Sequence, residues 1–271
     1  GQLSALLILA PLFTAFLVFG AGWFKIRWCY PLCLISLAIC LATALGLLLK
    51  VIQTGAIEYQ MGGWPAPFGI IYYIDHLNAL FLPWIAGVAL INLISSRLSI
   101  ENTQKEKSSI FYTLYLLTVT GLIGIVATGD AFNLFVLLEI ASLSSYALLA
   151  TGDRRAPLAS LNYLLVGTVG SSFYLLGIGY IYILTGSLTM IQIPDILAPL
   201  YASKAMLVAF TMCTVGVFIK MAFFPVHTWL SNTYTFTSSP AASLIAPLTT
   251  KVMVYVMLRL MLTVFTPEYV F

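Results

Sequence analysis

Long apolar runs, separated by short polar or proline- and glycine-rich segments, follow one another along the whole chain. A helix rises 1.5 Å per residue, so about 20 apolar residues cross the hydrocarbon core of a bilayer. Windows of that length predict eight membrane spans, at residues 3–24, 30–51, 71–95, 109–128, 130–150, 157–184, 203–224 and 238–263. The first run is too long for a signal-peptide core and no convincing cleavage site follows it, so we interpret it as a span.

Composition supports the same class. The chain is 61% hydrophobic and 8% charged, with a mean hydropathy of +1.02, whereas soluble domains average about 25% charged residues. We therefore expect an all-α polytopic membrane protein, with residues 1–271 forming a single transmembrane domain. The net charge of +3 is small and scattered, which argues against nucleic acid as a partner.

Motifs for independent catalysis are missing from the sequence. It contains no nucleotide-binding motif, no cluster of metal ligands and no Ser/His/Asp arrangement placed to act in solution. The four cysteines lie inside or at the edge of apolar runs, without zinc-site spacing, and we expect them to be small buried residues (Cys29, Cys33, Cys40 and Cys213). We expect no cofactor and no metal in this chain, and an independent enzyme is the weakest interpretation.

Basic residues between the predicted spans indicate the orientation. With the N-terminus outside, seven lysines and arginines fall in inner loops and three in outer segments; the inner ones are Lys25, Arg27, Arg97, Lys105, Lys107, Arg154 and Arg155, and the outer ones Lys50, Lys204 and Arg259. Because basic residues favour the cytoplasmic side, this distribution predicts an external N-terminus.

Three connections and one span have distinctive compositions. Residues 55–69 are rich in Gly, Pro and aromatics and predict an external interfacial loop, while the charged residues 97–107 predict a solvated inner loop. Prolines interrupt residues 188–200, which we interpret as an external turn or surface helix. Small residues let helices approach closely in membranes, so the glycines of the sixth span predict tight packing (Gly167, Gly170, Gly177 and Gly179).

Three ionisable residues fall inside predicted spans. Glu139 lies near the middle of residues 130–150, and Lys220 and Lys251 lie in the seventh and eighth spans. A charge at the bilayer centre costs roughly 2.5–3.5 kcal/mol on insertion scales, so such residues are functional candidates by default.

Proline accompanies both lysines. Pro225 cannot donate a hydrogen bond to the carbonyl of Met221, which predicts a kink or break in the seventh span just after Lys220. His227, which can be neutral or charged near physiological pH, follows that break. Broken helices beside charged groups recur in ion-translocating proteins, where the freed backbone lines a cavity or is buried in protein.

The eighth span carries a similar feature, because Pro247 removes the hydrogen bond to the Ser243 carbonyl one turn before Lys251. Glu139 and Lys220 could form a purely structural ion pair between helices, but a second lysine does not fit that interpretation. We therefore predict that both lysines load and release protons and that Glu139 biases Lys220 electrostatically.

Three stretches of the chain resemble a known family. They are residues 62–75 (GGWPAPFGIIYYID), 130–152 and 220–260, and they are similar to the antiporter-like subunits of respiratory complex I, Mrp-type sodium/proton antiporters and membrane-bound hydrogenases. Their sequence is most similar to that of the D-type component of Mrp antiporters. In that family, Glu139 matches the glutamate of the fifth helix, Lys220 and Lys251 match the lysines of the broken seventh and the eighth helix, and His227 matches a bridging histidine. Asp75 matches an aspartate of accessory role, although an interfacial polar pair with His76 is the plainer interpretation.

The resemblance implies an architecture and a function. Residues 109–263 would form the first five-helix repeat after N-terminal helices at 1–108, and the matched residues would build one proton half-channel. The chain would then be a proton-translocating or cation/proton-antiporting subunit of a redox-driven pump or an Mrp-type antiporter in the cytoplasmic membrane. Its protein partners would be other membrane subunits, including a chain that supplies further helices. The transported ions would be protons, either alone or together with sodium.

Some residues depart from the family pattern. Ser231 and Asn232 stand where proline and aspartate are usual, and Met253 stands where glycine is usual. These departures keep an alternative open, in which the chain is a non-conducting structural module that anchors partner subunits.

Overall fold

Eight long apolar helices form the body of the protein. The structure, a computed structural model, describes residues 2–66, 69–104, 107–152, 154–200 and 203–266. Within that part, eight helical stretches are long and apolar enough to cross a membrane, which confirms the predicted class and number of spans. The spanning helices are α1 (Gln2–Phe24), α2 (Cys29–Thr54), α3 (His76–Gln104), α4 (Ser108–Ala127), α5 (Ala131–Leu149), α6 (Ala156–Thr185), α8 (Lys204–Met221) and α10 (Ser239–Arg259). Two shorter helices, α7 (Ile193–Leu197) and α9 (Thr228–Phe236), lie between them.

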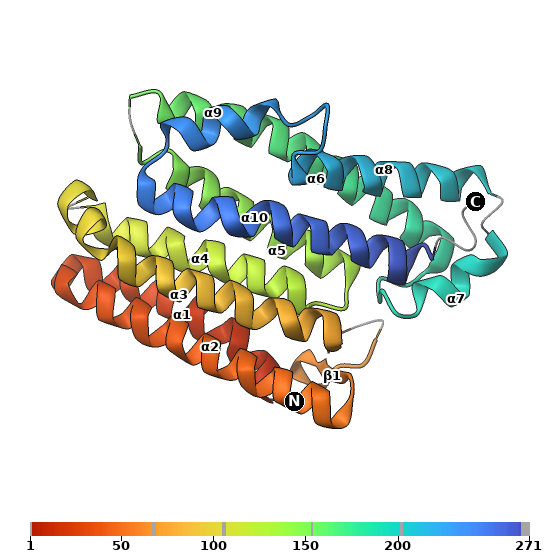
Figure 1. Cartoon of the computed structure of the whole chain (residues 1–271). Helices are drawn as coiled ribbons and strands as arrows, with labels where there is room; N and C mark the ends of the chain where they lie inside the picture. The colour runs from red at the N-terminus through yellow and green to blue at the C-terminus, as the bar shows by residue number, and fades with distance from the viewer. Residues whose placement is uncertain (1, 67–68, 105–106, 153, 201–202, 267–271) are drawn as a thin grey trace.

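The long helices run back and forth along one axis, with β1 and α7 at one end of the bundle and α9 towards the other (Figure 1). α4 lies at the centre: 83% of its apolar window is buried, against 39% for α1, α2, α6 and α8. Its neighbours are α1, α3, α5 and α10. Apolarity alone does not set this position, because α1 is more apolar than α4 and yet only 39% of its window is buried.

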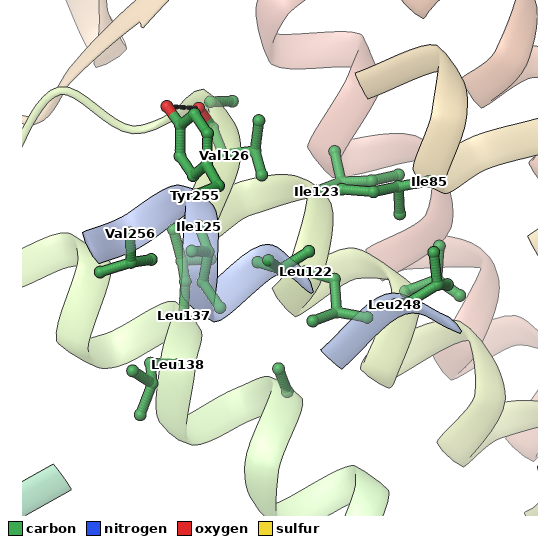
Figure 2. Packing of buried hydrophobic residues seen from close by; sticks show 14 of the residues in the cluster. Ile85, Leu122, Ile123, Ile125, Val126, Leu137, Leu138, Leu248, Tyr255 and Val256 are labelled. Atoms are coloured by element: carbon green, nitrogen blue, oxygen red, sulfur yellow. Dashed lines mark hydrogen bonds between the residues drawn. The ribbon is translucent and has the colours of Figure 1, made fainter. Parts of the chain in front are cut away.

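Side chains of α3, α4, α5 and α10 interdigitate around this centre (Figure 2). Leu122 and Val126 of α4 are fully buried beside Leu248 and Val256 of α10. The Tyr255 hydroxyl donates to the Val126 carbonyl at 3.0 Å, so this buried polar group is also satisfied. The four cysteines are free and buried, as predicted.

A β-hairpin precedes α3, and it corrects two predicted boundaries. β1 (Ile57–Gln60) pairs antiparallel with β2 (Ile71–Ile74), Tyr59 opposite Tyr72. The predicted loop at 55–69 therefore contains a strand, and the predicted span at 71–95 begins too early. Hydropathy cannot separate the two cases, because the Ile and Tyr residues of β2 are apolar and also favour strands.

The predicted inner loop at 97–107 is also wrong over most of its length, because α3 continues to Gln104. Arg97 and Glu101 lie one turn apart in this extension and form an ion pair, with Nε and Oε1 3.0 Å apart. Such pairs favour a solvated helix over a loop.

Backbone hydrogen bonds join three distant segments at the hairpin end of the bundle. The Gly129 N–H donates to the Ile71 carbonyl at 2.8 Å, and the Met190 N–H donates to the Gly129 carbonyl at 2.9 Å. The irregular backbone at this end thus finds partners inside the protein, as a membrane protein requires. The short helix α7 follows, in agreement with the surface helix or turn expected at 188–200.

The seventh predicted span is broken where the sequence indicates. α8 ends at Met221, Ala222 adopts the left-handed conformation with φ 56°, and its N–H donates to the Ile219 carbonyl at 3.2 Å. A linker containing Pro225 leads to α9. α10, by contrast, runs as one helix through Pro247.

Glycines bring α6 and α8 into close contact. A Cβ at Gly216 would lie 2.6 Å from the Gly170 carbonyl oxygen and 2.6 Å from the Tyr174 nitrogen, and one at Gly177 would lie 2.8 Å from the Cys213 nitrogen. These are backbone atoms that cannot rotate away, so the predicted tight packing of the sixth span is confirmed. Gly179 is the exception, since a Cβ there would meet nothing within 4 Å.

We predict that Gly216→Ala destabilises the protein by about 1–3 kcal/mol, the usual effect of overpacking a core. Thermal unfolding of the detergent-solubilised protein should show a lower midpoint. Gly179→Ala, on the neighbouring helix and in open space, is the control and should leave the midpoint unchanged or raise it slightly. Equal midpoints for the two variants would contradict the close contact.

Candidate functional site

The site is centred on the ammonium group of Lys220. This residue lies in the last turn of α8, and only 4% of its side chain is exposed. Its Nζ donates to the Ser142 hydroxyl at 2.8 Å and to the Tyr146 hydroxyl at 3.2 Å. Glu139 completes the group, with Oε1 3.9 Å from Nζ.

The three partners of Lys220 share one face of α5. Glu139, Ser142 and Tyr146 are spaced by three and four residues, the spacing that aligns side chains along a helix. The sequence indicated Glu139 but not the two hydroxyls, which look ordinary in an apolar run. Their helical spacing from a charged residue is the signal that would have found them.

Glu139 is less completely satisfied than Lys220. Its side chain is 24% exposed, yet Oε1 is buried and accepts no hydrogen bond within the described part of the chain. At 3.9 Å the contact with Lys220 is an electrostatic one, too long for a hydrogen bond. The lysine is therefore held by two short hydroxyl contacts, and the carboxylate acts on it through its charge.

Tyr146 is held in place by residues of α6 and α9. A Cβ on Gly167 of α6 would overlap the Tyr146 hydroxyl, so only glycine leaves room for it. The Tyr146 ring meets Tyr163 edge-on at 4.5 Å, and Tyr163 stacks on Trp229 of α9 at 4.0 Å. Trp229 in turn donates to the carbonyl of Ile219, the residue before the lysine, at 3.2 Å. The break between α8 and α9 thus contributes to the site.

Two of the residues predicted for the site lie elsewhere. His227 is exposed in the linker immediately before α9, and its ring centroid is 5.6 Å from that of Phe224. Lys251 is exposed as well, and its Nζ donates to the Ala246 carbonyl at 2.9 Å. The structure therefore brings together Glu139 and Lys220 but not these two.

Lys251 lies inside the eighth span, as predicted, but the orientation of α10 leaves its side chain exposed in this chain. Lys251, Val254 and Leu258 fall on the exposed face of the helix, while the intervening residues pack inward. Lys251 lines an apolar surface pocket of about 440 Å³ formed with Leu80, Phe81, Trp84 and Val254.

Asp75 forms a second charged contact, with a partner that the sequence did not indicate. Its Oδ1 accepts from the N–H groups of Leu77 and Asn78 at 3.0 and 3.2 Å and pairs with Arg259 of α10. Arg259 also donates from Nε to the Tyr255 hydroxyl at 2.8 Å. His76, by contrast, is exposed, so the partner of Asp75 in the structure is Arg259 rather than its neighbour in sequence.

The contact with Arg259 sets the protonation of Asp75. Burial alone would raise the pKa of its carboxyl, but the hydrogen bond and charge of Arg259, with the two backbone N–H groups, outweigh it and lower the pKa. The carboxylate therefore stays ionised and joins the start of α3 to the end of α10. Within the described residues, no group of three or more His, Cys, Asp and Glu side chains could hold a metal ion.

Comparison with protein families gives one match over more than half of the chain. Residues 128–270 match the family described as NADH:quinone oxidoreductase/Mrp antiporter, TM. This range contains Glu139, Lys220 and most of the residues around them.

Individual relatives agree with this match. The chain is 37% identical over 265 residues to NADH-quinone oxidoreductase subunit N of Desulforudis audaxviator, covering 96% of this chain and 52% of that protein. It is 38% identical over 216 residues to a probable K(+)/H(+) antiporter subunit of Rhizobium meliloti, covering 78% of this chain and 39% of that protein. A solved chain of the membrane-bound sulfane sulfur reductase, an archaeal respiratory membrane complex, superposes with a TM-score of 0.90 at 31% identity, covering 98% of this chain and 54% of that one. The chain thus spans about half the length of these relatives, or less.

We predict that Asp75→Asn lowers stability by about 2 kcal/mol at neutral pH, the typical effect of losing hydrogen bonds to a charged group. The folded pKa lies below the unfolded one, so the stabilisation is present above the unfolded pKa, about 3.9, and is lost as pH falls through the folded pKa. Unfolding measured across pH should show the gap between variant and wild type closing in acid. Asp195→Asn, an exposed carboxylate of α7, is the control; a similar loss there would contradict the role of Arg259.

Proposed function

This chain belongs to the NADH:quinone oxidoreductase/Mrp antiporter transmembrane family, and we propose that it translocates protons as one subunit of a larger membrane complex. The observation that carries the proposal is the buried ammonium of Lys220, in contact with two hydroxyls and 3.9 Å from Glu139. A lysine so enclosed is expensive to keep charged in a membrane, and it persists where proton transfer uses it.

The contacts of Lys220 support a route for the proton. Serine and tyrosine hydroxyls both donate and accept hydrogen bonds, so Ser142 and Tyr146 can each receive a proton from the ammonium while passing their own proton to a further acceptor. The Oε1 of Glu139, which accepts no hydrogen bond from the described residues, offers such an acceptor on the same helix face. In this proposal, Lys220 is the proton carrier and the α5 hydroxyls are its first exchange partners.

Electrostatics provides the coupling. At an effective dielectric constant of about 20, unit charges about 4 Å apart interact by about 4 kcal/mol, and doubling their separation halves this value. The change of about 2 kcal/mol matches the work of moving one proton across about 100 mV. A movement of α5 relative to α8 that separates Glu139 from Lys220 would therefore be sufficient to release the proton from the lysine.

The whole complex is part of the proposal. Relatives are named as subunits of oxidoreductases and antiporters, so we propose other membrane subunits as partners, which would hold any redox cofactor. Lys251 and His227 lie on exposed surfaces, and in this proposal they exchange protons with groups on helices packed there. We also propose that the N-terminus is external, because basic residues gather at the α1–α2 and α5–α6 turns.

Replacing the carrier tests the function. We expect Lys220→Ala to lower proton uptake at least tenfold when the assembled complex, reconstituted in vesicles, is followed with an internal pH-sensitive dye. Lys204→Ala removes an exposed lysine from the first residue of the same helix and should leave uptake unchanged. Normal uptake by Lys220→Ala in a correctly assembled complex would leave only the non-conducting structural module.

The positioning of Tyr146 gives an independent prediction. Gly167→Ala should push the Tyr146 hydroxyl away from Lys220 and reduce proton uptake several-fold, because a misplaced proton-transfer group is less efficient. Tyr146→Phe removes the same hydroxyl and should reduce uptake to a similar extent. Gly179→Ala, on the same helix but in open space, is the matched control. Full activity of both Gly167→Ala and Tyr146→Phe would exclude this hydroxyl from the route.

A further inference from the structure

A polar cavity lies where α1 turns into α2 and α3 turns into α4, well away from Lys220 along the sequence. Its volume is about 420 Å³, and its lining includes Ile26, Arg27, Tyr30, Arg97, Glu101 and Tyr112. The lining residues lie within the first 112 positions of the chain, whereas the family match begins at residue 128. The proton route proposed above uses none of them.

The charges in this cavity do not cancel. Arg97 is paired through Nε with Glu101 at 3.0 Å, and its guanidinium lies 4.4 Å from the centre of the Tyr30 ring. These two contacts fix the guanidinium plane and leave its terminal N–H groups available. Arg27 has no hydrogen-bond or ion-pair partner within the described part of the chain. Among the described residues of the lining, one positive charge is therefore uncompensated.

Tyr112 adds a buried donor to the same cavity. The residue is 2% exposed, and its hydroxyl is buried with no hydrogen-bond partner in the described residues. Its ring is fixed edge-on against Tyr30, with centroids 6.2 Å apart. Leaving a buried hydroxyl without a hydrogen bond is unfavourable, and an acceptor placed in the cavity would remove that penalty.

We propose that this cavity binds a phosphate anion, carried either by a phospholipid headgroup or by inorganic phosphate. Guanidinium groups match phosphate oxygens with parallel hydrogen bonds, and the Tyr112 hydroxyl supplies a further donor. The cavity lies at the ends of membrane-spanning helices, where headgroups are found, and Ile26 and Tyr30 provide apolar surface for a glycerol backbone. Basic pockets between transmembrane helices bind acidic headgroups by the same physics.

Native mass spectrometry of the purified full chain can test the site with phosphatidylglycerol, with diacylglycerol of the same acyl chains, and with inorganic phosphate as competitor. We expect phosphatidylglycerol to bind more tightly than diacylglycerol. Arg27→Gln should weaken that binding about tenfold, and Tyr112→Phe should weaken it several-fold, the effects of losing a charged and a neutral donor. Arg154→Gln, which removes an exposed arginine from the α5–α6 turn, should have no effect.

The competition with inorganic phosphate also distinguishes the source of the anion. Displacement of phosphatidylglycerol by inorganic phosphate identifies a site for the free anion, whereas binding that phosphate does not displace identifies the lipid headgroup; both support the proposal. Equal binding of phosphatidylglycerol and diacylglycerol, or equal losses in Arg27→Gln and Arg154→Gln, would overturn it. Arg27 is exposed, so its replacement leaves the packed helices intact.

Discussion

A hydrocarbon core offers no hydrogen bonds, so a charged or backbone polar group within the spans is stabilised by a partner inside the protein. Lys220 illustrates this constraint, because its ammonium donates to the hydroxyls of Ser142 and Tyr146 and lies beside the carboxylate of Glu139. The irregular backbone at the hairpin end meets the same requirement through bonds between residues far apart in sequence. The arrangement of the bundle follows from where these partners have to be.

Close contact between helices fixes the positions of the side chains around Lys220. Gly170 and Gly216 let α6 and α8 approach until backbone atoms touch, and Gly167 leaves just enough room for the Tyr146 hydroxyl. The stacked rings of Tyr163 and Trp229 then connect this tyrosine to the helix that follows the break. Interiors packed this closely transmit small displacements, so the distance between Glu139 and Lys220 depends on how α5, α6 and α8 sit together.

The two charged residues of α10 face opposite ways. Arg259 faces inward and is held by Asp75, whereas Lys251 faces outward beside apolar side chains of α3. Apolar surface next to a cation is typical of a face that packs against another element. This chain covers about half the length of its relatives, and the face that carries Lys251 is where we propose contact with further helices.

The sequence by itself determined the class of the protein, the number of spans and the break after Lys220, because hydropathy and proline chemistry are local properties. It also identified Glu139 and Lys220 as charges within the spans, because the cost of an intramembrane charge is local too. It misplaced the start of α3, since a strand and a helix of Ile and Tyr have the same hydropathy. Only the tertiary structure decided which groups meet: Ser142 and Tyr146 with Lys220, Arg259 with Asp75, and Lys251 outside the cluster. Those contacts depend on how each helix is rotated about its axis, and that rotation is fixed by packing against neighbours distant in sequence.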